Sequence, residues 1–278
     1  MPPPNPRAEL ALTRHPPSTH VVTVRLVSTH GGRRYRLFVA APMDKPQTGC
    51  PALYLLDGNA AFDALPAALL AQFPHLAVIG IGYDVETAFD FEARAFDYTP
   101  AARSGSGVPA GHDRPRRAAG GAPQFLQALR DEIIPPLERE FGLDGERRTL
   151  WGQSFGGLFA LHAMARTSGL FSAYAIASPS LWWDDGSILD EVADSAPRLS
   201  GLSIELSRGD SERPSDGSRI DAKTPFERLA RLLSAVPAIS CTVRIFEGAG
   251  HRDVLDLSLP FALRLAAGSN KDDGNNQV

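Results

Sequence analysis

Cysteine is scarce in this 278-residue chain, which contains only Cys50 and Cys241. The two lie far apart in the sequence, and neither belongs to a CxxC pair or to a cluster of histidines and cysteines. A disulfide framework needs several cysteines, and a structural zinc site needs a set of closely spaced ligands. The sequence therefore favours neither, and we expect two buried thiols and no metal site.

The chain also lacks an excess of charge of either sign. It has 28 Lys and Arg residues against 32 Asp and Glu residues, which gives a formal net charge of −4. A nucleic-acid partner would require a strongly basic surface, so this balance argues against one for the whole protein. Hydrophobic residues make up 43% and charged residues 22%, which is typical of a soluble globular protein with its own core.

Long apolar runs are missing as well. No segment approaches the roughly 18–20 apolar residues that a membrane-spanning helix needs, so membrane insertion is not expected. Residues 8–14 are too short and too charged to form the apolar region of a signal peptide. We therefore expect a cytoplasmic protein, or a periplasmic one if a leader has been removed.

What the sequence does contain is an alternation of strand and helix patterns. Residues 21–27 and 34–39 are rich in β-branched and aromatic residues, and Gly31-Gly32 between them predicts an antiparallel hairpin. Continuous apolar runs joined by helical patterns follow, which is typical of a parallel sheet covered on both faces. This alternation predicts an α/β fold. The other predicted strands are residues 52–56, 76–81, 147–151, 173–177, 202–206 and 241–246, and the predicted helices are residues 62–73, 123–141 with a kink at Pro135-Pro136, 155–166 and 225–235.

We expect one domain, at residues 21–267. The proline-rich residues 1–20 and the polar residues 268–278 are interpreted as disordered tails. Residues 84–122 are polar, rich in glycine and arginine, and longer than the connections that compact domains usually contain. This segment is predicted to be a lid or binding loop.

The most informative motif is Gly152-Gln153-Ser154-Phe155-Gly156, a G-x-S-x-G sequence between a predicted strand and a predicted helix. In this context the glycines permit a sharp turn that exposes the serine Oγ. The helix that begins after the serine directs free amide N–H groups at an oxyanion forming beside Oγ. The motif therefore predicts that Ser154 is a nucleophile, against the alternative of an ordinary glycine turn.

A serine hydroxyl is a weak nucleophile and needs a base within hydrogen-bond reach. In folds with this motif the order along the chain is serine, acid, histidine, which excludes every histidine before Ser154. His162 lies about two helical turns after Ser154 and is interpreted as a packed or surface side chain. His251, in the loop after the last predicted strand, is the predicted base. The histidines excluded by order are His15, His20, His30, His75 and His112.

The acid is expected after the preceding predicted strand, where Gly209-Asp210-Ser211-Glu212 offers two carboxylates. Glu212 is the first choice, because a strand that ends in G-x-x-acid is the usual arrangement in hydrolases with this motif. Its carboxylate would accept the Nδ1–H of His251 and stabilise the imidazolium. Asp210 is the second choice, and a solvated surface carboxylate is the alternative for either residue.

An oxyanion hole needs amide N–H donors on both sides of the reacting carbonyl oxygen. The N–H of Phe155 is one predicted donor. The end of the first parallel strand, Leu56-Asp57-Gly58-Asn59, contains a glycine that allows close approach of the backbone to a substrate. The N–H groups of Gly58 and Asn59 are the other predicted donors, and Asp57 is interpreted as a turn residue.

Five segments occur in an order that is fairly specific as a set, although only the serine motif is diagnostic alone. Together they resemble the esterase-type α/β-hydrolases, and in particular the siderophore esterases that hydrolyse enterobactin-like and salmochelin-like trilactones. The resemblance covers about residues 21–266. The segments are Tyr54-Leu55-Leu56-Asp57-Gly58-Asn59, Gly80-Ile81-Gly82-Tyr83, Arg94-Ala95-Phe96-Asp97-Tyr98-Thr99-Pro100, Gly152-Gln153-Ser154-Phe155-Gly156-Gly157 and Ser178-Pro179-Ser180-Leu181-Trp182-Trp183.

The resemblance implies an α/β-hydrolase fold with a mostly parallel central sheet, an antiparallel N-terminal hairpin and helices on both faces. It implies that Ser154 and His251 are catalytic, together with an acid on which some members depend little. It also implies that Trp182 and Trp183 lie beside the nucleophile. Their rings would suit catechol groups, although a tryptophan after a strand is as often part of the core.

The resemblance further implies that Arg94 lies near the substrate. A planar guanidinium suits an anionic or catechol oxygen, but a salt bridge from Arg94 to Asp97 or Asp90 that fixes the loop is an equal alternative. Further arginines in the predicted lid would suit a negatively charged ferric catecholate, and the alternative is a solvated loop. They are Arg103, Arg114, Arg116 and Arg117.

The expected function is that of a serine esterase without a metal or organic cofactor. Its expected small-molecule partner is a catecholate siderophore, iron-free or ferric, whose lactone bonds it cleaves through an acyl-enzyme. A general carboxylesterase of the feruloyl or thioester type is a second reading, because the fold does not determine the substrate. A binding scaffold with an idle triad is a third. The sequence does not indicate the oligomeric state.

Overall fold

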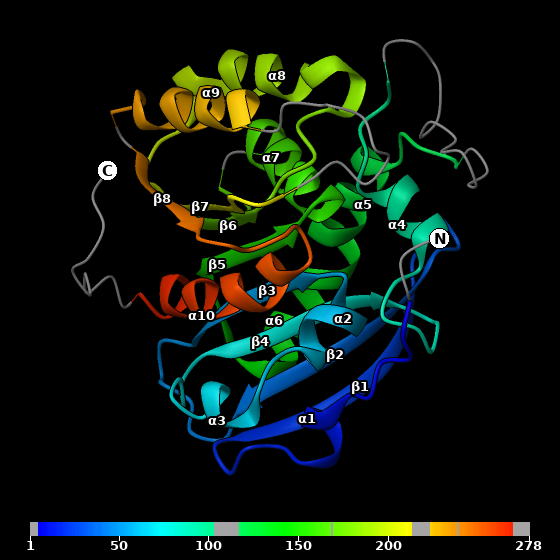
Figure 1. Cartoon of the computed structure of the whole chain (residues 1–278). Helices are drawn as coiled ribbons and strands as arrows, with labels where there is room; N and C mark the ends of the chain where they lie inside the picture. Colours follow the sequence, from blue (N-terminus) through cyan, green and yellow to red (C-terminus); the bar gives the residue numbers. More distant parts are fainter. Residues whose placement is uncertain (1–4, 103–116, 168, 213–222, 238, 269–278) are drawn as a thin grey trace.

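A mixed sheet forms the centre of the protein in a computed structural model, which describes residues 5–102, 117–167, 169–212, 223–237 and 239–268. Across these residues the strand order is β1-β2-β4-β3-β5-β6-β7-β8 (Figure 1). β2 pairs antiparallel with β1 and β4, and the later pairings are parallel. The strands are β1 (His20–Ser28), β2 (Arg34–Pro42), β3 (Cys50–Leu56), β4 (Ala77–Tyr83), β5 (Leu143–Gln153), β6 (Ala173–Ala177), β7 (Leu202–Gly209) and β8 (Ile239–Phe246).

Helices cover both faces of this sheet (Figure 1). Successive side chains of a strand point to opposite faces, so Tyr54 and Leu56 of β3 enter one core and Leu53 and Leu55 enter the other. The predicted α/β-hydrolase fold, with its antiparallel hairpin, is confirmed. The helices are α1 (Ala11–Arg14), α2 (Gly58–Asp63), α3 (Ala67–Leu70), α4 (Phe91–Asp97), α5 (Ala122–Ala128), α6 (Ile134–Phe141), α7 (Phe155–Arg166), α8 (Ser187–Ser195), α9 (Lys223–Ser234) and α10 (Asp253–Ala267).

Prolines explain where the predicted helices differ from the observed ones. The helix predicted at residues 62–73 is wrong. The chain forms α2 and α3 instead, with Pro66 as the extended residue that precedes α3. The helix predicted at residues 123–141 contains a wider π-helical turn, Leu129–Ile133, just before the two prolines in the first turn of α6. α1, α4, α8 and α10 were not predicted, and α10 contains Pro260, a residue that usually ends a helix.

Residues 5–20, expected to be a disordered tail, pack against the domain instead. The Asp63 carboxylate at the end of α2 accepts the backbone N–H groups of Glu9 and Leu10. Leu12 in α1 is only 1% exposed and belongs to the core shared by α2 and α10. Proline content predicted the absence of a long helix but not these contacts, because they depend on side chains far along the chain.

The predicted lid is partly described. Its first part contains α4, whose N-terminus is capped by the Asp90 carboxylate through the N–H groups of Glu92 and Ala93. Residues 103–116 lie outside the described part. At the C-terminus, Gly268 ends α10 in the left-handed conformation that suits glycine, and residues 269–278 of the expected second tail also lie outside it.

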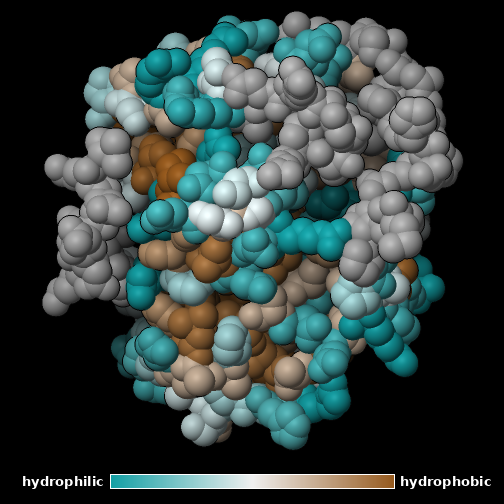
Figure 2. Space-filling view, viewed as in Figure 1, coloured by the Kyte–Doolittle hydropathy of each residue, from teal (hydrophilic) through white to brown (hydrophobic). Residues whose placement is uncertain are grey.

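This face of the surface carries several apolar patches, one of them near the β8 end of the sheet and others in the lower half of the view (Figure 2). Val243 and Ile245 are exposed on this edge strand. Among the helices that the structure describes, none is both long and apolar enough to cross a membrane.

Substitution of Leu12 tests the packing of the N-terminal segment. Leu12→Ala should lower the free energy of unfolding by about 2–5 kcal/mol, because it leaves a cavity in a packed core. Urea unfolding measures this loss. Leu257→Ala, at a position of α10 that is 41% exposed, is the control and should change it by less than about 0.5 kcal/mol. A loss for Leu12→Ala no larger than about 0.5 kcal/mol would mean that the packing of Leu12 does not stabilise the fold.

Candidate active site

Ser154 sits on a strained turn between β5 and α7. Its backbone has φ 59° and ψ −117°, a conformation that a non-glycine residue rarely adopts. The turn needs Gly152, because a Cβ there would lie 2.3 Å from the carbonyl oxygen of Gly156. The N–H of Ser154 donates to the carbonyl of Ala177, which ties the turn to the end of β6. Local geometry thus agrees with the predicted nucleophile turn.

His251 follows β8 and contacts Glu212. Its Nδ1 lies 2.8 Å from Glu212 Oε2, which leaves Nε2 as the ring nitrogen that can accept a proton. The Gln153 side chain donates a hydrogen bond to the backbone carbonyl of His251. The residue beside Ser154 therefore holds the histidine loop.

The carboxylate of Glu212 accepts hydrogen bonds from three groups. Oε1 accepts the Ser178 hydroxyl and, at 2.7 Å, the N–H of Gly209, while Oε2 faces His251. Burial by itself raises the pKa of Glu212, but these hydrogen bonds and the nearby imidazole outweigh burial and hold that pKa below its usual value. Glu212 is therefore ionised at neutral pH and able to stabilise a positive charge on His251.

Asp210 does not contact His251. Its carboxylate accepts the N–H of Gly248 at 2.8 Å and the hydroxyl of Ser211, and the side chain is exposed. Asp210 thus fixes the loop after β8. Of the two predicted acids, Glu212 is the one that forms a hydrogen bond with His251 in the described part of the chain.

Ser154 and His251 are not directly hydrogen-bonded among the contacts of the described residues. Ser154 Oγ lies 3.2 Å from Ser180 Oγ instead. Ser180 belongs to the turn after β6, and its N–H donates to the Ser154 carbonyl. The Ser154 hydroxyl thus has the Ser180 hydroxyl as its neighbour at hydrogen-bond distance.

The predicted oxyanion donors begin two helices. Phe155 is the first residue of α7, and Gly58 and Asn59 are the first two residues of α2. N–H groups in the first turn of a helix have no carbonyl acceptor within that helix, so these three can bind another oxygen. The close approach requires glycine, since a Cβ on Gly58 would lie 2.6 Å from the backbone of Gly80. The Asn59 side chain accepts the N–H of Tyr83 and donates to its carbonyl, which ties α2 to β4.

Arg94 binds the turn that carries these donors. Its Nε and Nη2 lie 2.9 and 2.8 Å from the two carboxylate oxygens of Asp57, and both side chains are buried. Tyr98, which follows the last residue of α4 and caps its C-terminus, accepts the N–H of Asp57 at 2.9 Å. We call Arg94, Tyr98 and Asp57 the α4 clamp.

The clamp corrects two sequence-based interpretations. Arg94 pairs with neither Asp97 nor Asp90, because Asp90 caps α4 and Asp97 binds Arg33 and the Tyr35 hydroxyl. Asp57 is more than a turn residue, since its φ of 50° is held by two partners. Burial raises the pKa of Asp97 to about 6 despite the nearby Arg33.

The two tryptophans have different environments. Trp182 is 43% exposed and its ring centre lies 5.7 Å from that of Phe155, beside the nucleophile. Trp183 is buried, and its indole N–H donates to the carbonyl of Pro100. Trp182 thus offers an accessible aromatic surface at the site, and Trp183 joins the β6 turn to the segment after α4.

Of the lid arginines, only Arg117 lies within the described residues. It pairs with Glu92 at 2.8 Å and its guanidinium lies over the Phe91 ring. Arg103, Arg114 and Arg116 lie outside the described part. The predicted positive charge of the lid can therefore be followed only at Arg117, which is paired with Glu92.

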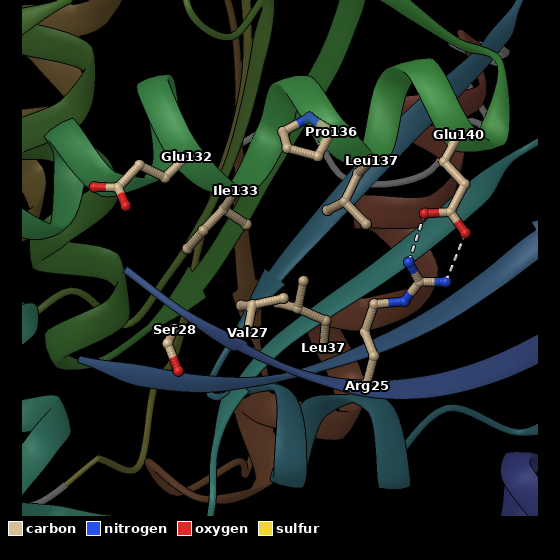
Figure 3. A pocket seen from close by; sticks show the side chains of 9 residues that line it. All are labelled: Arg25, Val27, Ser28, Leu37, Glu132, Ile133, Pro136, Leu137 and Glu140. Carbon is tan, nitrogen blue, oxygen red and sulfur yellow. Dashed lines mark hydrogen bonds and ion pairs between the residues drawn. The ribbon is translucent and has the colours of Figure 1, made fainter. Parts of the chain in front are cut away.

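A hollow of about 290 Å³ lies elsewhere, between β1, β2 and the π-helical turn and α6 (Figure 3). Arg25 reaches across it to Glu140, 2.8 Å away, above apolar side chains such as Val27 and Leu137. None of its lining residues belongs to the candidate site. The candidate active site is therefore identified by the hydrogen bonds around Ser154 and His251, and not by this hollow.

Sequence reasoning did not assign roles to Gln153, Tyr98, Ser178 and Ser180. Small hydroxyl and amide side chains are common at strand ends, so their type carries no signal. The one available signal is the spacing of Arg94 and Tyr98, since residues four apart lie on the same face if the segment is helical.

Comparison with known proteins was consistent with this geometry. Residues 28–251 match the model of a family described as "Putative esterase". An apo-salmochelin esterase of Escherichia coli O6:H1 is 38% identical over 182 residues, which are 64% of this chain and only 57% of that protein. The ferri-bacillibactin esterase BesA of Bacillus subtilis is 31% identical over 261 residues, 87% of this chain and 88% of that protein.

A solved structure agrees as well. That of the enterobactin and salmochelin hydrolase IroE has a TM-score of 0.77 and 28% identity, and the match covers 93% of this chain and 99% of that one. The chain is thus similar to siderophore esterases in both sequence and fold.

Removal of the arginine in the α4 clamp tests the buried ion pair. Arg94→Met should lower the free energy of unfolding by about 3–5 kcal/mol, because it leaves the Asp57 carboxylate buried without its partner charge. The double variant Arg94→Met/Asp57→Asn should regain part of that loss, since no unpaired charge remains. Chemical denaturation measures both. Unchanged stability of Arg94→Met would contradict a structural role for the pair.

Proposed function

Because the chain belongs to the esterase family matched by residues 28–251 and is a serine ester hydrolase, we propose that it hydrolyses lactone bonds of a catecholate siderophore. The named activities of the relatives support this substrate class, since they include salmochelin, bacillibactin and enterobactin esterases. Any iron in such a substrate is cargo and takes no part in the protein's chemistry.

The observation that carries the proposal is the Glu212–His251 pair at the end of the sheet where Ser154 occupies a strained turn. An ionised carboxylate on Nδ1 fixes the tautomer in which Nε2 lacks a proton and can act as a base. A serine without such a base would be too weak a nucleophile for ester cleavage.

In the proposed cycle, Ser154 Oγ gives its proton to His251 Nε2 while it remains beside the Ser180 hydroxyl. Oγ attacks the ester carbonyl, and the N–H groups of Phe155 and of Gly58 or Asn59 bind the oxyanion. His251 then protonates the leaving alkoxide, and an acyl-enzyme remains. Water repeats these steps and frees the acid.

Substrate contacts are proposed for Trp182 and not for a free Arg94. The exposed Trp182 ring beside Phe155 suits stacking against a catechol ring. The guanidinium edge formed by Nε and Nη2 binds Asp57, so Arg94 contributes by fixing the oxyanion turn. The guanidinium carbon of Arg94 lies 5.4 Å from the centre of the Phe155 ring, so its positive charge lies close to the residue that follows Ser154.

The substrate class is tested by comparing an enterobactin-type trilactone, iron-free and ferric, with a short p-nitrophenyl ester. The kcat/KM for at least one trilactone form should exceed that for the simple ester by at least about tenfold, because remote contacts with the catechol arms lower the barrier. Ser154→Ala should abolish both activities and labelling by a fluorophosphonate. A trilactone rate no better than that of the simple ester would point to a general carboxylesterase.

The choice of acid is tested by a matched pair of substitutions, each of which removes one negative charge. Glu212→Gln should lower kcat by about a hundredfold to ten-thousandfold, because the wrong imidazole tautomer is then favoured. Asp210→Asn should leave kcat unchanged, since the amide oxygen still accepts the N–H of Gly248. Steady-state kinetics distinguish the two. A similar loss in both variants would refute the assignment of Glu212.

A further inference from the structure

One short turn contacts both ends of the proposed relay. The turn Ser178-Pro179-Ser180 follows β6, and its first hydroxyl donates to Glu212 Oε1 while its second lies 3.2 Å from Ser154 Oγ. The nucleophile and the acid belong to different strand ends, after β5 and β7. The turn after β6 lies between them in the sheet and is hydrogen-bonded to both.

The backbone of this turn is firmly held. Ser178 has φ 41°, which is rare for a non-glycine residue, and its N–H donates at 2.7 Å to the carbonyl of Ser207 in β7. The N–H of Ser180 donates to the carbonyl of Ser154. Both serine residues are buried, so their hydroxyls are committed to these contacts and not to water.

Ser178 must be the donor toward Glu212, because an ionised carboxylate only accepts hydrogen bonds. Oε1 takes Ser178 and Gly209, and Oε2 remains for His251. Three donors at fixed positions prevent rotation of the carboxylate, so that Oε2 stays on Nδ1. Ser178 thus acts on His251 through Glu212.

Ser180 contacts the reacting atom itself. When Ser154 gives its proton to His251, negative charge develops on Ser154 Oγ. This oxygen can then accept a stronger, charge-assisted hydrogen bond from the Ser180 hydroxyl. The same contact is available when Ser154 leaves again as an alkoxide during deacylation. Ser180 therefore favours both transition states over the ground state.

We infer that Ser178 is a positioning residue for the acid and that Ser180 is a further catalytic residue, which donates to Ser154 Oγ as its charge develops. This inference rests on the proposed serine esterase function. It assigns a role in the chemistry to two hydroxyls that neither the serine motif nor the acid and histidine include.

Ser178 is tested by a double-mutant cycle with Glu212. Ser178→Gly removes the hydroxyl while glycine adopts a φ of 41° without strain. It should lower kcat by about tenfold to hundredfold in the wild-type background, which is the worth of a hydrogen bond to a charged group. In the Glu212→Ala background it should cost no more than about twofold, because its acceptor is gone. Equal losses in both backgrounds would overturn the role through Glu212.

A matched serine provides the control. Ser211 lies in the loop after β7, and its hydroxyl donates to the exposed Asp210. Ser211→Ala should leave kcat unchanged in either background, so a loss specific to Ser178 reports its carboxylate partner and not the removal of a hydroxyl as such.

Ser180 is tested by the rate of fluorophosphonate labelling and by kcat. Ser180→Ala should lower both by about tenfold to hundredfold and leave KM unchanged, since the contact strengthens only as charge develops. Ser180→Cys, which keeps the shape of the side chain with a slightly larger atom and has only a weak donor, should lose about as much. Labelling of both variants at the wild-type rate would overturn this role.

Failure of the inference is distinct from failure of the proposed function. If the wild-type protein is neither labelled nor active, the serine hydrolase mechanism fails. If the wild-type protein is labelled and the Ser178 and Ser180 variants match it, only the inference fails. Denaturation curves confirm that each variant is folded, and Ser180→Cys decides the matter if Ser180→Ala is not.

Discussion

Parallel pairing of β3 and β5 to β8 is the constraint on which the site depends. Parallel strands end at the same edge of a sheet, so the residues that follow them meet although the chain between them is long. Each strand of this set supplies one part of the site from the residues after its carboxyl end. Asp57 follows β3, Ser154 follows β5, Ser178 follows β6, Glu212 follows β7 and His251 follows β8.

Two carboxylates, the buried Asp57 and the partly buried Glu212, determine how precisely these parts are held. A charge taken out of water is costly unless it is paired and hydrogen-bonded. The Asp57 carboxylate pairs with Arg94, and the Asp57 backbone N–H donates to the Tyr98 hydroxyl. The Glu212 carboxylate binds groups from the ends of β6, β7 and β8. The result is that both the oxyanion turn and the imidazole are fixed before a substrate binds, which is what a preorganised site requires.

Much of this candidate site was predictable from the sequence, because a short motif and the order of residue types along the chain identify its members. The G-x-S-x-G turn predicted Ser154, and the order of serine, acid and histidine singled out His251 before any contact was known. The choice between Asp210 and Glu212 was open, since the two lie two residues apart. Side-chain reach decided it, because Asp210 turns to Gly248 while Glu212 meets Nδ1 of His251.

The partner of Arg94 could not be read from the sequence. Its acidic neighbours Asp90 and Asp97 were the obvious candidates, yet a helix cap and Arg33 already occupy them.

By itself, the sequence determined the fold class, the strained serine turn and the chain order of the candidate catalytic groups, because these depend on local periodicity, on glycine and on chain direction. Only the tertiary structure decided which carboxylate meets His251, that Arg94 binds Asp57, and that Ser180 holds Ser154. These contacts join residues from 26 to 39 positions apart. They follow from the register of the sheet and the packing of α4, which no local pattern encodes.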